Sequence, residues 1–366
     1  MSSPILPDAR YLREALERAG RNLEVENIEV RELDDGRQSN KVFSVRAAEQ
    51  GSFVVKTFPT PSWRDPIFGK GNGEVGLWRT GVTRNLPAPV QCPTIDVSHR
   101  SDPEEDWMLM EDVSGGIMAR GVYDEKKLKW LLRALAAMHA HYWGKESDLS
   151  TFPLISLETH CTYLAEPVIA LGGRRPAEGW VKDAIENVTV LKPFVPLFLE
   201  TLGPDADFYL DLAQYRKNWV DILAQSPQTL VHGDIRRANV APFSEDKVVL
   251  FDWDMACRAP AAADLGWFWL LHFWAYPPQG AEDPATHEPL REYYVDELQK
   301  RLGQRFDRAD FERSWELGWL KAFMQLGFCL IDPLIGPHDA ATLETVRAKV
   351  LLAVAEAKRI HNKHLR

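Results

Sequence analysis

The chain has 366 residues, of which 45% are hydrophobic and 26% are charged, as is typical of a globular protein with a sizeable core. Acidic residues outnumber lysine and arginine by 53 to 43, so the formal net charge is −10. This balance excludes the broad basic surface that nucleic acids and anionic membranes require. Four scattered cysteines form no CxxC pair and predict reduced thiols. With no signal peptide or membrane span predicted, we expect a cytoplasmic protein; the sequence does not indicate its oligomeric state.

The first 110 residues predict a short helix and then an antiparallel sheet. The helix is expected over residues 8–19, with Asp8 as its cap and Gly20 at its end. Extended patterns follow, and a further helix is expected from Gly73 to about Asn85. Together these patterns predict a five-stranded antiparallel sheet with one long helix. The expected strands cover residues 28–30, 42–45, 53–58, 94–97 and 107–110.

The pattern becomes mainly helical after Ser114-Gly115-Gly116, where a hinge is expected. Residues 150–204 are punctuated by proline and glycine and are predicted to be irregular or helical. The fold class is therefore α+β, with a small lobe over residues 1–111 and a larger, mostly helical lobe over 112–366. Helices are expected over 124–143, 208–223, 290–302, 308–329 and 339–360, and short strands over 229–231 and 248–251.

Three polar residues in the second lobe are candidates for chemistry. Asp234 lies in the stretch VHGDIRRAN, Asn239 follows five residues later, and Asp252 comes after the next apolar strand in LFDWD. Each lies in a loop just after a strand, which places its side chain in a cleft. Two carboxylates and an amide suit phosphoryl transfer, in which one carboxylate accepts a proton and the other, with the amide oxygen, holds Mg²⁺.

The pattern HGDxxxxN followed by FDWD resembles the aminoglycoside phosphotransferase and choline kinase superfamily of small-molecule kinases. The resemblance implies a bilobal fold like that of protein kinases, with ATP or another nucleoside triphosphate and Mg²⁺ as cofactors. It also implies a small-molecule hydroxyl as the phosphate acceptor. Asp234 would be the catalytic base, and Asn239 and Asp252 would be the metal ligands.

The resemblance assigns the nucleotide site to the first lobe. Lys56 would contact the α- and β-phosphates, and Glu74 would be its ion-pair partner. Residues 36–40, with Ser39 and Asn40, would form the turn over the phosphates. The hinge from Met110 to Val113, including Glu111, would read the adenine edge through its backbone.

Each of these nucleotide-site residues also has an ordinary structural interpretation. Lys56 shares a strand face with Val54 and Phe58, and a lysine there can simply extend to solvent at a sheet edge. Glu74 can be a normal first-turn glutamate of a helix. The DGRQSN stretch can be a plain hairpin turn.

Other positions have supporting roles by the same resemblance. Asp264 would brace the catalytic loop, with His232 and Asp254 beside the reacting groups; Asp254 can equally be a solvated carboxylate. Arg236 would touch substrate or phosphate.

Tryptophans cluster after Asp264. Trp269 and Trp274 are the candidates for contact with substrate, by stacking or cation–π attraction. The alternative is that this aromatic helix is packed on all sides in the core.

The spacing separates this chain from protein kinases. Asp264 follows Asp252 by only twelve residues, which leaves no room for an activation segment. We therefore expect a metabolite kinase, with a non-catalytic nucleotide- or metabolite-binding module as the main alternative and a protein kinase as the lesser one. An aminoglycoside, a sugar, an amino alcohol or a natural-product hydroxyl all remain open as acceptors. The acceptor pocket is expected between residues 150–204 and the helices after Asp264, with at least one acidic and one aromatic wall residue.

Overall fold

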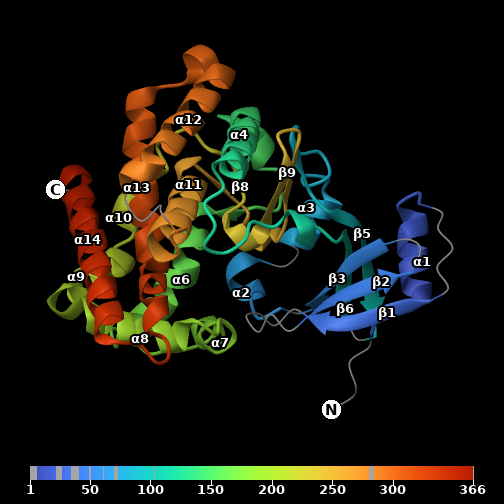
Figure 1. The fold of residues 1–366 in the computed structure, drawn as a ribbon, viewed down its shortest axis with the longest axis horizontal. Coiled ribbons are helices and arrows are strands. Elements are labelled where there is room, and N and C mark those ends of the chain that lie inside the picture. Colours follow the sequence, from blue (N-terminus) through green and yellow to red (C-terminus); the bar gives the residue numbers. More distant parts are fainter. Residues whose placement is uncertain are drawn as a thin grey trace.

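The structure is a computed structural model with two lobes on either side of the central strands (Figure 1). At one end lies a sheet covered by helix α1 (Ala9–Arg18), and at the other end lies a large group of helices that includes the C-terminus. The predicted phosphate turn, with Ser39 and Asn40, falls outside the described residues. The structure describes residues 6–21, 27–33, 41–48, 51–60, 62–69, 73–102, 104–279 and 284–365.

The first lobe contains the predicted five-stranded antiparallel sheet, in the order β1-β2-β3-β6-β5. Its register sets Lys56 on β3 opposite Met108 on β6 and Val42 on β2. The sheet therefore confirms the strand prediction and puts Lys56 on a central strand. The strands are β1 (Ile28–Leu33), β2 (Val42–Ala47), β3 (Gly51–Pro59), β5 (Thr94–Ser101) and β6 (Glu104–Glu111).

The two faces of β3 have different partners because side chains alternate along a strand. Phe53 and Val55 pack in the apolar cluster beneath α1. Val54 and Phe58 point to the other face, with Lys56 between them, toward the second lobe. The shared face predicted for these three residues is confirmed.

The prediction of one long helix in this lobe is wrong. Helix α3 spans only Glu74–Arg79, after the short α2 (Asp65–Phe68), and turns follow to Asn85. The Thr80 hydroxyl donates to the carbonyl of Gly76, which competes with helix continuation, and Gly81 adopts φ +86°.

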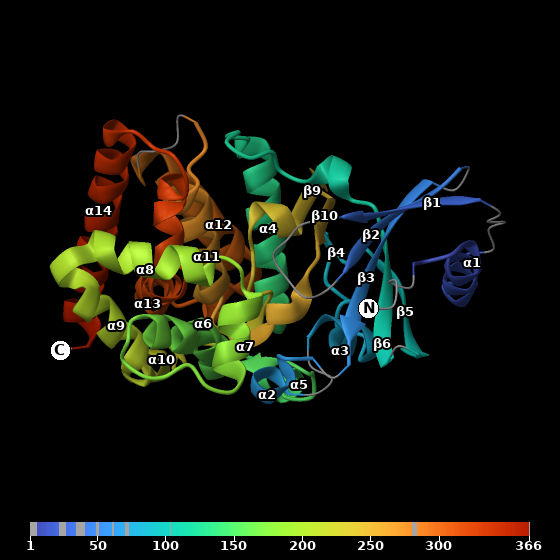
Figure 2. The same ribbon diagram turned by 90° about the horizontal axis from the view of Figure 1, so that it is seen from below.

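The second lobe is mostly helical, and Figure 2 shows its helices stacked beside the central strands. The segment 150–204, predicted to be irregular or helical, holds three helices, even though Pro167 lies inside α6 and Pro196 inside α8. In place of the single helix expected over 208–223 there are two, α9 and α10, because the chain bends at Tyr215 and Arg216.

The helix bounds in the second lobe largely match the remaining predictions. The long helices are α4 (Glu125–Tyr142), α12 (Pro284–Leu302), α13 (Arg308–Leu326) and α14 (Ala340–His364). The others are α5 (Glu146–Leu149), α6 (Leu157–Leu171), α7 (Trp180–Asn187), α8 (Leu191–Leu202), α9 (Ala206–Gln214), α10 (Lys217–Leu223) and α11 (Ala262–Trp269).

Short strands between the lobes carry the candidate chemistry. Strands β8 and β10 are the two that the sequence predicted; β4, from the first lobe, pairs with β10. The two lobes are therefore joined by strand pairing as well as by the hinge. The strands are β4 (Val90–Gln91), β7 (Ile155–Ser156), β8 (Thr229–Val231), β9 (Val240–Ser244), β10 (Lys247–Leu250) and β11 (Cys257–Ala259).

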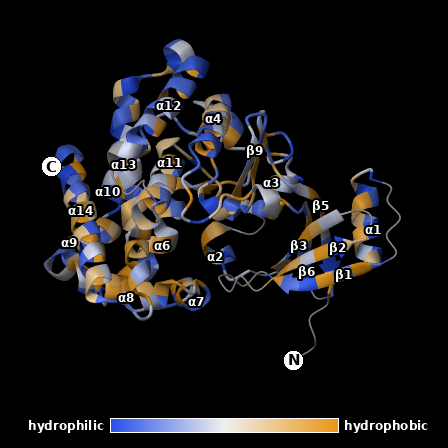
Figure 3. Cartoon of the chain, viewed as in Figure 1, coloured by the Kyte–Doolittle hydropathy of each residue, from blue (hydrophilic) through white to orange (hydrophobic). Residues whose placement is uncertain are grey.

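The apolar residues gather where the helices of the second lobe meet. In Figure 3, α8 is mostly orange, whereas α12, at the outer edge, is mostly blue. Within the described residues, no helix combines the length and the apolar character needed to cross a membrane.

Helices α11 and α13 approach each other through glycines. A Cβ on Gly266 would lie 2.2 Å from the carbonyl oxygen of Gly318, and a Cβ on Gly318 would lie 2.3 Å from that of Ala262. Backbone meets backbone here, so only glycine permits this spacing. The contact fixes α11, which carries Asp264.

We predict that Gly266→Ala destabilises the protein by about 1–3 kcal/mol, because the added methyl group must push two helix backbones apart. The urea midpoint of unfolding, followed by circular dichroism, measures the effect. Gly115→Ala is the matched control, since no atom lies within 4 Å of its Cβ position. Equal midpoints for the two variants would contradict the packing argument.

Candidate active site

The loop that carries Asp234 is held by a buried carboxylate. Asp264, with no exposed surface, accepts hydrogen bonds from the backbone N–H of His232 at 2.8 Å and of Gly233 at 2.7 Å. It also accepts from Nε2 of His139 at 3.2 Å. Burial raises the pKa of Asp264, but these donors, with His139 foremost, outweigh burial and leave the pKa below its usual value.

Gly233 is required by the shape of this loop. Its φ is +84°, and a Cβ there would lie only 2.0 Å from the carbonyl oxygen of Met255. The ring of His160 donates from Nε2 to the carbonyl of Gly233 at 2.9 Å. Asp264 therefore holds the N–H of this glycine and His160 holds its carbonyl, both from the second lobe.

Asp234 is surrounded by donors. Its Oδ1 accepts from Nε1 of Trp267 at 2.9 Å, and its Oδ2 accepts from Asn239 at 2.8 Å and from Arg236 at 3.1 Å. Burial, the largest effect, raises the pKa of Asp234, and the guanidinium of Arg236 lowers it; the balance is a raised pKa. The carboxylate is thus fixed in position and more basic than an ordinary aspartate.

His232 joins this loop to the next one. Its Nε2–H donates to the carbonyl of Phe251 at 2.9 Å, and its Nδ1 accepts from the backbone N–H of Asp234 at 3.3 Å. Burial lowers the pKa of His232, which favours the neutral ring that this donor–acceptor pair needs. The backbone N–H of Phe251 in turn donates to the carbonyl of Asn239 at 3.1 Å.

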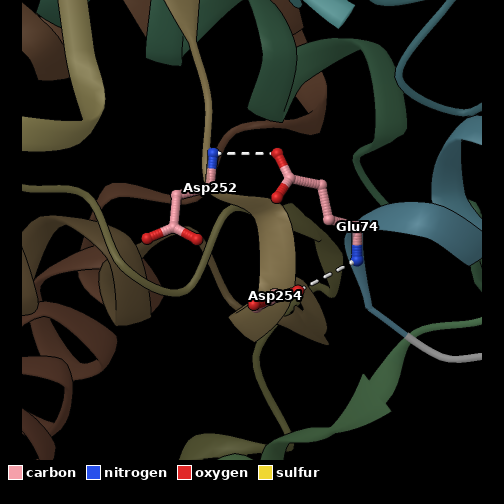
Figure 4. Close-up of side chains that lie close together, drawn as sticks. All are labelled: Glu74, Asp252 and Asp254. Carbon is pink, nitrogen blue, oxygen red and sulfur yellow. Dashed lines mark hydrogen bonds between the residues drawn. The ribbon is translucent and has the colours of Figure 1, made fainter. Parts of the chain in front are cut away.

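Asp252 meets Lys56 and Glu74 across the lobes. The ammonium of Lys56 donates to Asp252 at 2.7 Å and to Glu74 at 2.8 Å. The backbone N–H of Asp252 donates to the other oxygen of Glu74 at 3.1 Å, as Figure 4 shows. Asp252 adopts φ +65°, and it alone among the described non-glycine residues has a positive φ. Such strain is common where a side chain is aimed at a ligand.

The pKa values of this group reflect burial in competition with opposite charge. For Lys56 burial lowers the pKa, but the surrounding carboxylates, with Asp252 foremost, raise it well above its usual value. Burial raises the pKa of Asp252, and the charge of Lys56 more than reverses this, leaving it well below its usual value. Glu74 is the exception, because burial dominates and raises its pKa to about 6.

Asp254 completes a cluster of three carboxylates. Ligand atoms of Glu74, Asp252 and Asp254 lie within 4.8 Å of one another, a spacing that can hold a metal ion. Two cations partly neutralise this cluster: Lys56 lies 3.7 Å from Asp254, and Arg64 donates to Asp254 at 2.8 Å. The backbone N–H of Glu74 also donates to Asp254, as drawn in Figure 4.

The pair predicted to hold Mg²⁺ has suitable atoms. The amide nitrogen of Asn239 is committed to Asp234, through its backbone carbonyl at 3.0 Å and its side chain at 2.8 Å, so the amide oxygen is left for a ligand. One oxygen of Asp252 accepts from Lys56, while the other lies 3.9 Å from Arg236 and accepts no hydrogen bond from the described residues. Amide and carboxylate oxygens are the hard ligands that Mg²⁺ prefers, so these residues fit the ion.

The hinge residues have different surroundings. The backbone N–H of Glu111 donates to the carbonyl of Pro93 at 2.9 Å, and its carboxylate pairs with Arg21. Val113 is buried against Ala241 and Val249, with Phe251 packed on the same cluster. The N–H of Glu111 is therefore already used within the first lobe, whereas Val113 contributes apolar surface between the lobes.

A cavity of about 230 Å³ opens beside Asp234 and Asp252. Part of its wall comes from residues 150–204 and from the segments after Asp264, the two regions between which the acceptor pocket is expected, and this part includes an acidic and several aromatic side chains. Lining residues from these two regions include Tyr163, Val188, Trp267, Tyr276, Phe328 and Asp332.

The prediction that Trp269 and Trp274 contact substrate is not supported by their positions. Trp269 is buried in the core, where its Nε1 donates to His287, and Trp274 packs on Trp319; neither lines the cavity. Trp267 lines it instead. The sequence contained the signal, since Trp267 lies three residues after Asp264 and so shares its face of α11. Arg236, for which contact with substrate or phosphate is expected, also lines the cavity.

Comparison with known proteins gives a family and a fold. The sequence model described as the phosphotransferase enzyme family matches residues 29–302. No protein with a curated description matches the chain. This family match confirms the resemblance and the enzyme class that the sequence predicted.

Solved structures of similar fold cover nearly the whole chain at low identity. One, from Ralstonia eutropha JMP134 and provisionally described as an aminoglycoside phosphotransferase, has a TM-score of 0.52 at 14% identity and covers 98% of this chain and 99% of its own. Spectinomycin phosphotransferase with ADP and spectinomycin has 0.51 at 14%, covering 98% and 99%. Amicoumacin kinase with AMP-PNP and Ca²⁺ has 0.53 at 14%, covering 95% of each chain. These likenesses confirm the predicted bilobal, protein-kinase-like fold.

We predict that Asp264→Asn destabilises the protein, because an amide group cannot accept hydrogen bonds at both of its ends. One of the N–H groups of His232 and Gly233 would lose its acceptor, at a cost of about 1–3 kcal/mol. Urea unfolding measures the loss, with the exposed Asp246→Asn as control. A midpoint equal to that of the control would show that the brace contributes nothing.

Proposed function

The chain belongs to the phosphotransferase enzyme family, and from this premise we propose that it is a Mg²⁺-dependent kinase that transfers the γ-phosphoryl group of a nucleoside triphosphate to a hydroxyl group of a small molecule. The observation that carries the proposal is that Asp234 and Asp252 line one cavity, with Asn239 bonded to Asp234 and Lys56 bonded to Asp252. In this proposal residues 1–111 bind the nucleotide and residues 112–366 bind the acceptor.

Asp234 is the proposed catalytic base. Its raised pKa makes it a better proton acceptor, and the donors from Trp267 and Asn239 hold its oxygens toward the cavity. In the reaction the acceptor oxygen forms a bond to the γ-phosphorus while the bond to the β–γ bridging oxygen breaks. The hydroxyl proton goes to Asp234, and the nucleoside diphosphate leaves.

Lys56 is the proposed phosphate-binding cation. The carboxylates of Asp252 and Glu74 keep it charged despite its burial and hold it in place on β3 before a nucleotide arrives. Two neighbours of similar fold hold ADP or AMP-PNP, which supports nucleotide use here. The apolar surface of Val113 and Phe251 between the lobes suits an adenine ring.

Asp252 and Asn239 are the proposed metal ligands. Mg²⁺ bound there would neutralise charge that develops on the phosphates. Glu74 holds Lys56 beside Asp252. Arg64 neutralises Asp254, which therefore lies next to the metal site without being one of its proposed ligands. Arg236 faces both Asp234 and Asp252 and is placed to contact the transferred phosphoryl group.

Two rival functions fit the chain less well. A protein kinase needs an activation segment, and the twelve-residue step from Asp252 to Asp264 is filled by a 3₁₀ turn, strand β11 and the start of α11. A non-catalytic binding module has no need of a base held by three donors beside a cavity. Turnover of ATP with any hydroxyl acceptor separates the kinase from the module.

We predict that Asp234→Asn lowers turnover by about 10²–10⁴-fold, the usual contribution of a positioned general base. A panel of hydroxyl acceptors assayed with ATP and Mg²⁺ first identifies an acceptor for the wild type. Nucleotide binding to the variant, followed by calorimetry, should persist, because Asp234 has no proposed contact with the nucleotide. Turnover of the variant close to that of the wild type would refute the assignment of the base.

We also predict that Asp252→Ala weakens binding of the Mg²⁺–nucleotide complex more than Asn239→Ala does, because a carboxylate binds Mg²⁺ more strongly than an amide. Calorimetric titration with Mg²⁺–AMP-PNP, and with AMP-PNP in EDTA, separates the metal contribution from the rest. The difference between these two titrations should shrink in both variants. An unchanged difference in both would refute the metal site.

A further inference from the structure

The described lining of the cavity holds four aspartates and four arginines, and one of these arginines has no ion-pair partner. Four aspartates line it, and each has a cation within an ion-pair distance. The pairs are Asp234 with Arg236 at 3.1 Å, Asp252 with Lys56 at 2.7 Å, Asp254 with Arg64 at 2.8 Å and Asp332 with Arg120 at 3.0 Å. Each carboxylate of the described lining therefore has a cationic partner. Three of these partners are arginines of the lining, and the fourth is Lys56, which Asp252 shares with Glu74.

The arginine without an ion-pair partner among the described residues is Arg237. It is half-buried in the cavity wall, and it makes no hydrogen bond or ion pair with any residue that the structure describes. Its neighbours in the wall include two more guanidiniums, of Arg120 and Arg236, whose carboxylate partners are already assigned. A planar guanidinium with unused donors is suited to a carboxylate or phosphate group.

A second side chain of the same wall is also unpartnered. His272 is only 3% exposed, yet neither ring nitrogen has a hydrogen-bond partner among the described residues. It lies in a π-helical stretch, Leu270–Ala275, that continues α11, and such stretches are frequent at functional sites. Burial and then the charge of Arg237 lower the pKa of His272 to about 3, so its ring is neutral and offers one N–H donor.

Buried polar groups are nearly always hydrogen-bonded, so an unpartnered histidine beside an unpartnered arginine points to a missing ligand. Resting on the proposed kinase function, we propose that the acceptor carries an oxyanion, a carboxylate or phosphate, which Arg237 binds and to which His272 donates its N–H while the hydroxyl group lies at Asp234. Leu271, Tyr276 and Phe328 add apolar surface to the same cavity, which suits an acceptor with an apolar segment. An ammonium group in place of the oxyanion would instead meet the positive charge of Arg237.

The test compares acceptors that differ only in their far end. ω-Hydroxycarboxylates from hydroxybutanoate to hydroxyoctanoate are assayed with ATP and Mg²⁺ beside the matching ω-hydroxyalkyl phosphates, ω-hydroxyamides and ω-amino alcohols. We expect kcat/KM for an anionic member to exceed that of its amide by at least about tenfold, since a site built for a polar group rejects analogues that lack it. The two anionic arms distinguish a carboxylate from a phosphate.

Variants assign the preference to residues. Arg237→Gln should reduce the anion-to-amide ratio of kcat/KM toward one, Arg237→Lys should retain part of it, and His272→Phe should lower it. Arg347→Gln, which changes an exposed arginine on α14, should leave the ratio as in the wild type. A ratio that stays at the wild-type value in Arg237→Gln overturns the assignment to Arg237.

Calorimetric binding of the same compounds, without turnover, separates this inference from the kinase function. Turnover with equal kcat/KM for anionic and neutral ends overturns the oxyanion site and leaves the kinase intact. If the wild type binds the anions, Arg237→Gln abolishes that binding and no compound turns over, the oxyanion site is supported and the kinase function is overturned. If the anions neither bind nor turn over while an amino alcohol is phosphorylated, the oxyanion site is overturned and the kinase function stands. If no compound binds or turns over, both are overturned.

Discussion

The ammonium of Lys56 is the contact on which the arrangement of the site depends. It is buried on a central strand of the first lobe and bonds to Glu74 in its own lobe and to Asp252 in the other. A buried charge is costly to leave unpaired, so the two carboxylates hold the lysine and the lysine holds the lobes in register. In the proposed function the phosphates and Mg²⁺ would join these same charges, and the protein would meet them with groups already in position.

A second constraint fixes the proton acceptor relative to that charge cluster. Asp264 and Gly233 determine the path of the loop before Asp234, and His232 links the loop to the residue that precedes Asp252. Helix α11, held against α13 by backbone contact at Gly266, supplies both Asp264 and Trp267. Packing deep in the second lobe is therefore what places the carboxylate at the cavity.

The sequence could predict the features that depend on local pattern. Alternation of apolar residues located the strands, and the spacing of Asp234, Asn239 and Asp252 located the loops. It could not predict the length of α3, which the Thr80 hydroxyl and Gly81 end, or the helices of 150–204, whose buried faces outweigh their prolines. The preference for Trp267 over Trp269 was within reach of the sequence, because Trp267 lies three residues after Asp264 and shares its face of α11.

Net charge is a poor guide to what the cavity binds. The chain as a whole carries −10, which by itself would favour a cationic ligand, yet the acidic groups of the cavity wall are each matched by a cation. A ligand in a partly enclosed site responds to the nearest unmatched group, because charges at the distant surface are screened by solvent and salt. The lining of the cavity holds four aspartates and four arginines, so its formal charge is zero although the chain carries −10, and Arg237 is the arginine without a partner among the described residues. In our proposal this local group, and not the net charge of the chain, selects the acceptor.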